Sequence, residues 1–368
     1  MAERKKKISL SCVYMDDKIK QSVLKVLDSG HYILGEECMA FEEEFAQFIG
    51  TKYAVLTGSG TAAIWLSLIS LGVEPQDEII VPSHTAFPTI EPILSLKAKP
   101  VFVDIDSTYT IDPSQIEEKI TSKTKGIIPV HLYGHPADMG RIMKVAHKHK
   151  LFVLEDSCQS HGAKFKNKTV GSIGEAGCFS FYPSKNLTVC GDGGAVVTNN
   201  AHINDKIRML RDHGRVSKYI HKISGYNERF NEIQATIGRF GLKKLVAFNS
   251  RRREIAARYI KNLKGLPIIL PQQQEWAYHV WHMFVIRVKN RDEVRDYLSR
   301  KGIETGIHYP LPCHLQPAIL KTKRRIKLVL TEKWCKEILS LPIYPFLSDK
   351  KVDYICQQVE DSIQQKAI

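Results

Sequence analysis

Short apolar runs alternate with helical patterns between residues 50 and 200. The runs predict buried strands, and apolar positions three or four residues apart predict the helices between them. Because parallel strands covered on both faces read as continuous apolar runs, we expect a mostly parallel mixed sheet between helices. Strands are predicted at 53–56, 78–81, 101–104, 126–131, 151–155, 177–182 and 194–198, and helices at 61–71, 89–96 and 139–149.

The pattern changes after residue 200 and predicts a smaller α+β unit. Helices are predicted at 203–211, 232–259, 292–301, 331–339 and 350–364, with a strand at 281–288 and a loop rich in His and Pro at 307–317. The α/β chain is therefore predicted to have a large domain at 1–245 and a small C-terminal domain at 246–368. We expect residues 1–30 to pack at the junction of the two.

Composition sets the broad class of the protein. The chain has 368 residues, of which 43% are apolar and 25% are charged, a globular balance that excludes a disordered protein. Apolar runs fall short of the ~18 residues of a membrane span, and the N-terminus lacks a signal-peptide pattern, so we expect a cytoplasmic location. The eight cysteines form no C-x-x-C pair, which predicts reduced thiols rather than a zinc site.

The positive charge of the chain is unevenly distributed. The net charge is +14, and residues 201–368 carry 32 basic against 16 acidic side chains. One interpretation is an anionic partner, such as nucleic acid or a phosphorylated ligand. We favour solvated helix faces, and the densest run, 321–327, lacks the interleaved aromatic residues of a nucleic-acid stacking surface.

A glycine-rich segment, residues 58–61 (Gly-Ser-Gly-Thr), lies between a predicted strand and a predicted helix. Glycines let the backbone turn tightly, and a helix N-terminus offers free N–H groups to a phosphate. With Ala63 the segment also satisfies the G-x-G-x-x-A dinucleotide pattern, but the next strand does not end in the acidic residue of an NAD site. We favour a generic phosphate site. A plain glycine turn with Thr61 as the helix cap is the alternative.

Two further residues stand beside predicted strand ends. Asp156 directly follows the strand at 151–155, and Lys185 stands without basic neighbours after the strand at 177–182. A strand-end Asp can pair with a cationic ring nitrogen or bind a metal or a ribose, and a partly desolvated Lys can act as an amine nucleophile. Considered alone, Asp156 fits an ordinary loop carboxylate equally well, and Lys185 fits a surface residue in a turn.

The phosphate cradle, the strand-end carboxylate and the isolated lysine together describe a site for pyridoxal 5′-phosphate (PLP). The Lys185 amine would form a Schiff base with the aldehyde. Asp156 would keep the pyridine nitrogen protonated, so that the ring withdraws electrons, and the helix N-terminus would take the phosphate.

Several motifs in this order resemble those of the DegT/StrS-type sugar-nucleotide aminotransferases, which are PLP enzymes of the aspartate-aminotransferase fold (fold type I). The resemblance covers residues 10 to 350. Its motifs are residues 58–61, 130–139 (Val-His-Leu-Tyr-Gly-His-Pro-Ala-Asp-Met), 155–162 (Glu-Asp-Ser-Cys-Gln-Ser-His-Gly), 179–187 (Phe-Ser-Phe-Tyr-Pro-Ser-Lys-Asn-Leu), 225–229 (Gly-Tyr-Asn-Glu-Arg) and 341–345 (Leu-Pro-Ile-Tyr-Pro).

The resemblance implies roles for the cofactor residues. Lys185 would be the Schiff-base lysine, Asp156 would pair with the ring nitrogen, and Gln159 would lie near the ring hydroxyl. Asn227 would reach the phosphate bound by the neighbouring subunit, so that a homodimer shares its active sites. The remaining phosphate contacts would come from Gly60, Thr61 and Ser180.

The resemblance also implies a sugar pocket, for which the candidates are His161, Tyr182, His308 and Tyr309. The chain departs from the family pattern after the P-x-x-T segment at 82–85, where many members carry an aromatic residue that stacks on the cofactor ring. Here Ala86 follows, so we assign the stacking to His84, with Phe87 as the alternative. A branch of the family replaces the lysine with His and performs dehydration, and Lys185 argues against that branch.

We therefore expect a PLP-dependent aminotransferase that moves an amino group from L-glutamate to a dTDP-linked keto-6-deoxyhexose. Residues 82–86 resemble those of family members that act on 3-keto sugars, which favours a 3-keto sugar here; a 4-keto sugar on UDP or GDP is the alternative. More distant alternatives are an NAD-dependent oxidoreductase, from the glycine pattern, and a nucleic-acid-binding protein, from the basic C-terminal half. We expect no metal, nucleic acid or membrane among the partners.

Overall fold

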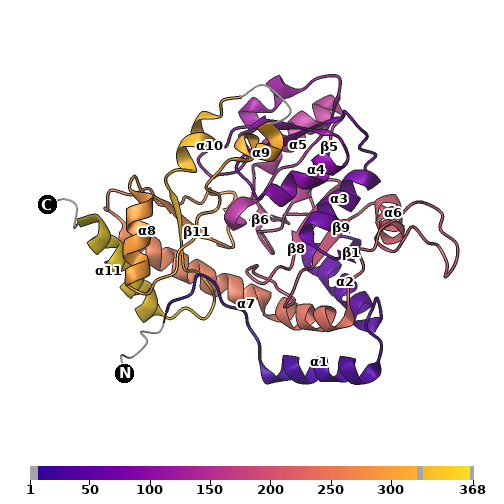
Figure 1. The fold of residues 1–368 in the computed structure, drawn as a ribbon, viewed down its shortest axis with the longest axis horizontal. Helices are drawn as coiled ribbons and strands as arrows, with labels where there is room; N and C mark the ends of the chain where they lie inside the picture. The colour runs from indigo at the N-terminus through magenta and orange to yellow at the C-terminus, as the bar shows by residue number, and fades with distance from the viewer. Residues whose placement is uncertain (1–6, 321–325, 365–368) are drawn as a thin grey trace.

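The computed structural model describes residues 7–320 and 326–364, and its centre is a seven-stranded sheet (Figure 1). The strand order is β1-β9-β8-β5-β4-β2-β3. The five strands from β8 to β3 are parallel, whereas β9 is antiparallel to both of its neighbours. This confirms the mostly parallel mixed sheet. The strands are β1 (Tyr53–Thr57), β2 (Glu78–Pro82), β3 (Lys99–Val103), β4 (Thr124–Ile127), β5 (Phe152–Asp156), β8 (Ala176–Ser180) and β9 (Gly194–Thr198).

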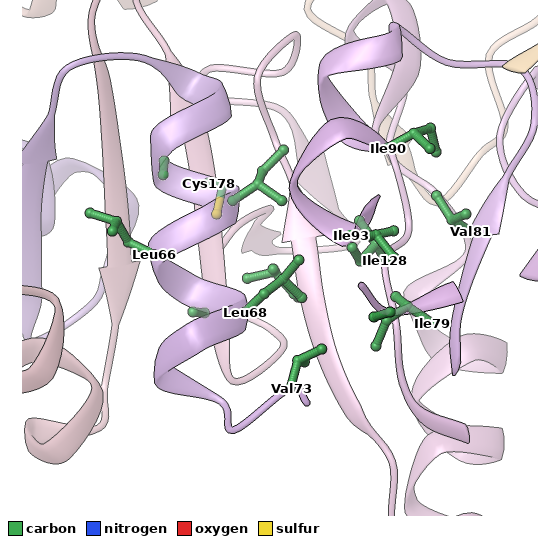
Figure 2. Packing of buried hydrophobic residues seen from close by; sticks show 14 of the residues in the cluster. Leu66, Leu68, Val73, Ile79, Val81, Ile90, Ile93, Ile128 and Cys178 are labelled. Atoms are coloured by element: carbon green, nitrogen blue, oxygen red, sulfur yellow. The ribbon is translucent and has the colours of Figure 1, made fainter. Parts of the chain in front are cut away.

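Helices cover the sheet and bury its apolar residues. Leu66 and Leu68 of the helix after β1 lie in one core with Ile79 and Val81 of β2, and all four are fully buried (Figure 2). Burial of apolar surface in this core stabilises the sheet by about 25 cal/mol per Å². The helices of this part are α1 (Asp17–Ser29), α2 (Glu36–Ile49), α3 (Gly60–Ser70), α4 (Glu91–Ser95), α5 (Met139–His149) and α6 (Ala201–Arg211).

The C-terminal part has its own small sheet and core. Strand β11 (Phe284–Arg287) pairs antiparallel with β12 (Ile338–Leu341). Tyr259, Phe284 and Ile355 are fully buried in its core. Helices α8 (Arg291–Arg300) and α11 (Asp349–Gln364) lie beside this sheet, and α9 (Pro317–Leu320) and α10 (Val329–Trp334) lie nearer the large one (Figure 1). A third sheet joins β10 (Ala277–Tyr278), β6 (Lys164–Phe165) and β7 (Lys168–Thr169).

One long helix, α7 (Glu232–Leu263), links the two parts. It runs without a break through residue 245, so the division at 245/246 stays a prediction. The N-terminal segment lies against the C-terminal part: Ile8 pairs with Ile303, and the Tyr14 ring stacks on Phe346 with centroids 5.4 Å apart.

Several element boundaries differ from the sequence prediction, and two of the differences have a direct physical reason. The helix predicted at 331–339 ends at Trp334, because Ile338–Leu341 are all buried as strand β12 against β11. The strand predicted at 126–131 ends at Ile127, because Pro129 has no N–H to donate to a ladder; only a single bridge from Val130 to Asp156 follows. Among the described helices, none is both long enough and apolar enough to cross a membrane.

Candidate active site

The turn between β1 and α3 forms a tight cradle. Ser59 is the N-cap of α3, and its hydroxyl accepts a hydrogen bond from the Ala62 N–H at 3.0 Å. Thr61 as helix cap is therefore wrong. A Cβ on Gly60 would lie 2.7 Å from the Ser180 Cβ and 2.9 Å from the Cys158 Sγ. The backbone thus meets the end of β8 closely, and the first-turn amides of α3 lack intrahelical acceptors, as a phosphate site requires.

Replacing Gly60 with alanine should therefore disrupt the cradle. We expect a loss of about 1–3 kcal/mol in unfolding free energy from overpacking, together with weaker cofactor binding. Gly58→Ala is the matched control, because its Cβ would lie 2.6 Å from the far end of the flexible Glu228 side chain and no nearer than 3.9 Å to the Glu228 backbone. Urea unfolding and cofactor titration of both variants would measure the difference. Equal behaviour of the two variants would show that the close approach at Gly60 is unimportant.

Asp156 is the last residue of β5, and its carboxylate is buried and held by two donors. Its Oδ2 accepts a hydrogen bond from Thr89 Oγ1 at 2.8 Å, and its Oδ1 accepts one from the Cys158 N–H at 3.1 Å. The carboxylate is thus fixed at the carboxyl end of the parallel strands, where ligands bind in open α/β sheets. Its remaining lone pairs can accept a proton donor from a bound ring.

Lys185 lies in the loop after β8 and is partly buried. Burial lowers the pKa of its amine, while the nearby Cys158 and Asp156 act in the opposite direction. A lowered pKa increases the uncharged, nucleophilic fraction of an amine. Lys185 also lines a pocket that opens to solvent and is bordered by Tyr14 and Arg252. The amine therefore lies close enough to Cys158 and Asp156 for their charges to act on it.

The depressed pKa of Lys185 predicts a pH-dependent stability of the cofactor-free protein. Between that pKa and the ordinary lysine pKa of about 10.4, the unfolded chain binds one more proton than the folded chain. Stability should therefore rise with pH across this window. Lys185→Met should remove the rise, and urea unfolding of both proteins from pH 7 to 10 would test it. Parallel stability curves would contradict the desolvated amine.

Gln159 and Tyr309 lie together, although 150 residues separate them. The Gln159 amide donates to the Tyr309 hydroxyl at 3.0 Å, and its carbonyl accepts from the Tyr133 N–H at 2.9 Å. The loop after β5 thereby contacts the His- and Pro-rich loop of the C-terminal part. Of the predicted sugar-pocket residues, Tyr309 is thus brought beside a predicted cofactor residue.

Two predicted sugar-pocket histidines lie near Lys185 and are uncharged. Burial, followed by the Lys185 charge, lowers the pKa of His161 to about 3 and that of His308 to about 4. His161 is fully buried, and neither of its ring nitrogens has a hydrogen-bond partner within the described chain.

The other predicted residues have more peripheral positions in the single chain. Tyr182 is 53% exposed. Asn227 is exposed as well, and its carbonyl accepts a hydrogen bond from Arg229 Nε at 3.0 Å. His84 is buried, with its Nε2 2.7 Å from the Tyr133 hydroxyl and its Nδ1 3.3 Å from the Cys335 Sγ. Both nitrogens are thus committed to protein partners, and the stacking of His84 on the cofactor ring stays a prediction.

Sequence reasoning missed Thr89 and Cys158. Thr89 holds the Asp156 carboxylate, and Cys158 packs between the cradle and Lys185. Only the position of Cys158 inside the motif at 155–162 could have signalled its role. His314, in the same loop as His308, is buried between Ser83 and Glu332, with its ring nitrogens at 2.6 and 3.3 Å from their side-chain oxygens.

These residues fit PLP. The cradle leaves no space for a side chain at Gly60, so a phosphate can come close to the backbone there. Asp156 and Lys185 supply the two groups that the ring nitrogen and the aldehyde of PLP require. Among the described residues, no group of three or more His, Cys, Asp or Glu side chains is arranged to hold a metal ion.

Comparisons with known proteins agree with this chemistry. Residues 13–360 match the model of the DegT/DnrJ/EryC1/StrS aminotransferase family. The chain is 43% identical over 329 residues to the dTDP-3-amino-3,4,6-trideoxy-alpha-D-glucose transaminase of Streptomyces venezuelae, covering 89% of this chain and 87% of that one. It is 42% identical to the UDP-N-acetyl-3-dehydro-alpha-D-glucosamine 3-aminotransferase of Acidithiobacillus ferrooxidans, covering 94% of each.

Solved structures are also similar. The S. venezuelae DesV structure, in complex with a ketimine intermediate, superimposes with a TM-score of 0.91 at 40% identity and 94% coverage of both chains. The Bacillus subtilis NtdA structure with bound PMP, the amine form of PLP, gives 0.89 at 34% identity and covers 95% of this chain and 83% of that one.

The fold and the site therefore define a PLP-dependent aminotransferase of fold type I. The chain belongs to the DegT/DnrJ/EryC1/StrS aminotransferase family, and its activity is that of a sugar-nucleotide aminotransferase.

Proposed function

We propose that the enzyme transfers an amino group from L-glutamate to C3 of a dTDP-linked 3-keto-6-deoxyhexose. The observation that carries the chemistry is the Lys185 amine, whose pKa is lowered by burial, close to the Asp156 carboxylate that Thr89 fixes. The choice of C3 is supported by relatives that are named as 3-amino sugar enzymes on both dTDP and UDP sugars. A 4-keto sugar on UDP or GDP is the second candidate.

PLP supplies an electron sink that stabilises negative charge on the carbon losing its proton. The protein residues hold and orient the cofactor and move the proton. The Lys185 amine would hold the cofactor aldehyde, and it would carry a proton as general base and then as general acid. Asp156 keeps the ring nitrogen protonated, and Thr89 keeps that carboxylate oriented. The Gly60 backbone and the hydroxyls of Thr61 and Ser180 would hold the phosphate.

The neutral histidines suit a sugar rather than a second anion. Because burial keeps His161 and His308 uncharged near pH 7, they can bind hydroxyl groups without attracting a phosphate. Tyr309 adds a hydroxyl from the same loop as His308. We propose that these residues, with Tyr182 at the solvent edge, bind the sugar ring.

A panel assay tests the substrate assignment. The purified enzyme would be incubated with ¹⁵N-labelled L-glutamate and dTDP-, UDP- and GDP-linked 3-keto and 4-keto sugars, and the products would be analysed by mass spectrometry. We expect label in the dTDP-3-keto sugar and none with Lys185→Ala. Preferred amination of a 4-keto sugar would refute the C3 proposal, and failure with every sugar would refute the assignment as a whole.

We also propose a homodimer in which Asn227 binds the phosphate held by the partner subunit. The exposed position of Asn227 on the single chain supports this. Mixing Lys185→Ala chains with Asn227→Asp chains should then restore about a quarter of the wild-type activity, because half of the randomly mixed dimers have one intact site. No recovery in demonstrably mixed dimers would contradict shared sites. The cytoplasmic location stays a prediction.

A further inference from the structure

A buried series of hydrogen bonds, which we call the relay, connects Cys335 at the end of α10 with His308 of the predicted sugar pocket. The Cys335 Sγ lies 3.3 Å from His84 Nδ1, and His84 Nε2 lies 2.7 Å from the Tyr133 hydroxyl. The Tyr133 hydroxyl in turn donates to the backbone carbonyl of His308. Cys335 and His84 are fully buried, and apart from the predicted stacking of His84 on the cofactor ring, the reaction as described above uses neither side chain.

The donor and the acceptor of each hydrogen bond in this relay follow from the last one, which the Tyr133 hydroxyl makes to the His308 carbonyl. A backbone carbonyl can only accept, so the Tyr133 hydroxyl must donate to His308 and must accept from His84. His84 therefore has its proton on Nε2, which leaves Nδ1 as an acceptor for the Cys335 thiol. Burial is consistent with this order, since it lowers the pKa of His84 to about 4 and raises that of Cys335 to about 12.

Tyr133 also belongs to a closed set of hydrogen bonds that includes Gln159. Tyr133 donates its backbone N–H to the Gln159 carbonyl while its hydroxyl holds the His308 carbonyl. Gln159 then donates to the hydroxyl of Tyr309, the residue that follows His308. Four residues from three distant parts of the sequence thus fix one another, and His84 fixes the hydroxyl of Tyr133 from outside this set.

The Cys335 thiol, where the relay begins, is also held in place. Cys335 is the C-cap of α10, and the N-terminal end of that helix is bound by Asp104, just after β3. The Asp104 carboxylate accepts hydrogen bonds from the backbone N–H groups of Leu330 and Thr331, at 2.9 and 2.8 Å, and from the Thr331 hydroxyl at 2.7 Å. The relay therefore links the large sheet to the C-terminal part through elements that are themselves anchored.

We propose that Cys335 and His84 are positioning residues, whose one-directional hydrogen bonds through Tyr133 hold the His308–Tyr309 segment against Gln159 and so set the geometry beside the cofactor ring. The cofactor half of this proposal rests on the proposed role of Gln159. The relay itself rests only on contacts within the chain. The two halves can therefore be tested separately.

Hydrogen–deuterium exchange of the cofactor-free protein tests the relay without any catalysis. Cys335→Ala removes the donor to His84, whereas Cys335→Ser replaces it by a better one. We expect the amides of the peptide spanning residues 305–312 to exchange about 3–5 times faster in the alanine variant, because that factor corresponds to the loss of one hydrogen bond of ordinary net strength. In the serine variant we expect the wild-type rate. Equal exchange in both variants would overturn the relay.

A second pair of variants tests the proton direction. The amide of His84→Gln reaches the position of Nε2 and can donate to Tyr133, whereas the shorter His84→Asn reaches only the position of Nδ1. Exchange of the 305–312 peptide should stay within about twofold of wild type in the glutamine variant and rise about tenfold in the asparagine variant, as for loss of a buried hydrogen bond. The reverse order would refute the assigned tautomer. Melting temperatures would confirm that each variant is folded.

The holoenzyme tests the cofactor half. Cys335→Ala should shift the pH at which the visible absorbance of the bound cofactor changes, and should lower kcat for the sugar more than it changes KM. Cys335→Ser should restore both values. If the exchange results are as expected but the absorbance titration of the alanine variant matches wild type, the link from the relay to the cofactor is refuted while the substrate assignment stands.

Discussion

Lys185→Ala should abolish amine transfer while leaving the fold intact. The variant loses the group that holds the aldehyde and the group that moves the proton, and proton transfer alone contributes roughly 10²–10⁴-fold. We therefore expect kcat to fall by at least about 10⁴-fold, measured with the sugar substrate and glutamate. The visible absorbance of the covalently held cofactor should also be lost. Turnover near the wild-type rate would refute the assignment of Lys185.

A matched variant separates the chemistry of Lys185 from its volume. Lys185→Met fills the same space without an amine and should be as inactive as Lys185→Ala. The alanine variant leaves a space beside a cavity that opens to solvent, so added ethylamine should restore part of the proton transfer in that variant alone. Equal rescue of both variants, or activity in the methionine variant, would contradict this role.

Asp156→Asn should have the second-largest effect. The asparagine keeps the size of the side chain and an oxygen for Thr89, but it removes the charge that keeps the ring nitrogen protonated. Breaking a buried charge pair costs about 3–5 kcal/mol, so we expect kcat to fall roughly 10²–10⁴-fold while the cofactor remains covalently held. Single-turnover kinetics and absorbance would measure both effects. An unchanged kcat would show that the ring nitrogen has another partner.

Thr89→Val is the control for Asp156. It leaves the charge in place and removes one hydrogen bond to the carboxylate, which is worth about 1.5–3 kcal/mol for a charged acceptor. Its effect on kcat should therefore be smaller than that of Asp156→Asn. A larger loss in the threonine variant would mean that the orientation of the carboxylate matters more than its charge.

Local patterns were sufficient to predict the sheet and most of its helices. Continuous apolar runs identified the parallel strands, and the prediction of helix 139–149 matches α5. The pattern failed where a contact far along the chain decides the outcome. Residues 338–339 extend a helical pattern, but their burial against β11 places them in a strand. Helices α1 and α2 precede residue 50, where the prediction began, and were missed for that reason.

The site was predictable where its chemistry lies in one short motif. Asp156 and Lys185 each stand beside a strand end, and the parallel sheet brings those ends together. Their supporting residues were not predictable in this way. Thr89 meets Asp156 across 67 residues, and His84 meets Cys335 across 251. Neither spacing has a pattern in the sequence, because only the folded chain defines these contacts.

The most direct test of the central claim is a map of the covalently bound cofactor. The holoenzyme would be reduced with borohydride, digested with a protease and analysed by mass spectrometry. Our account predicts a phosphopyridoxyl group on the peptide that contains Lys185, and no such group in the Lys185→Ala variant. A reduced cofactor on any other lysine, or none on the chain at all, would contradict the account.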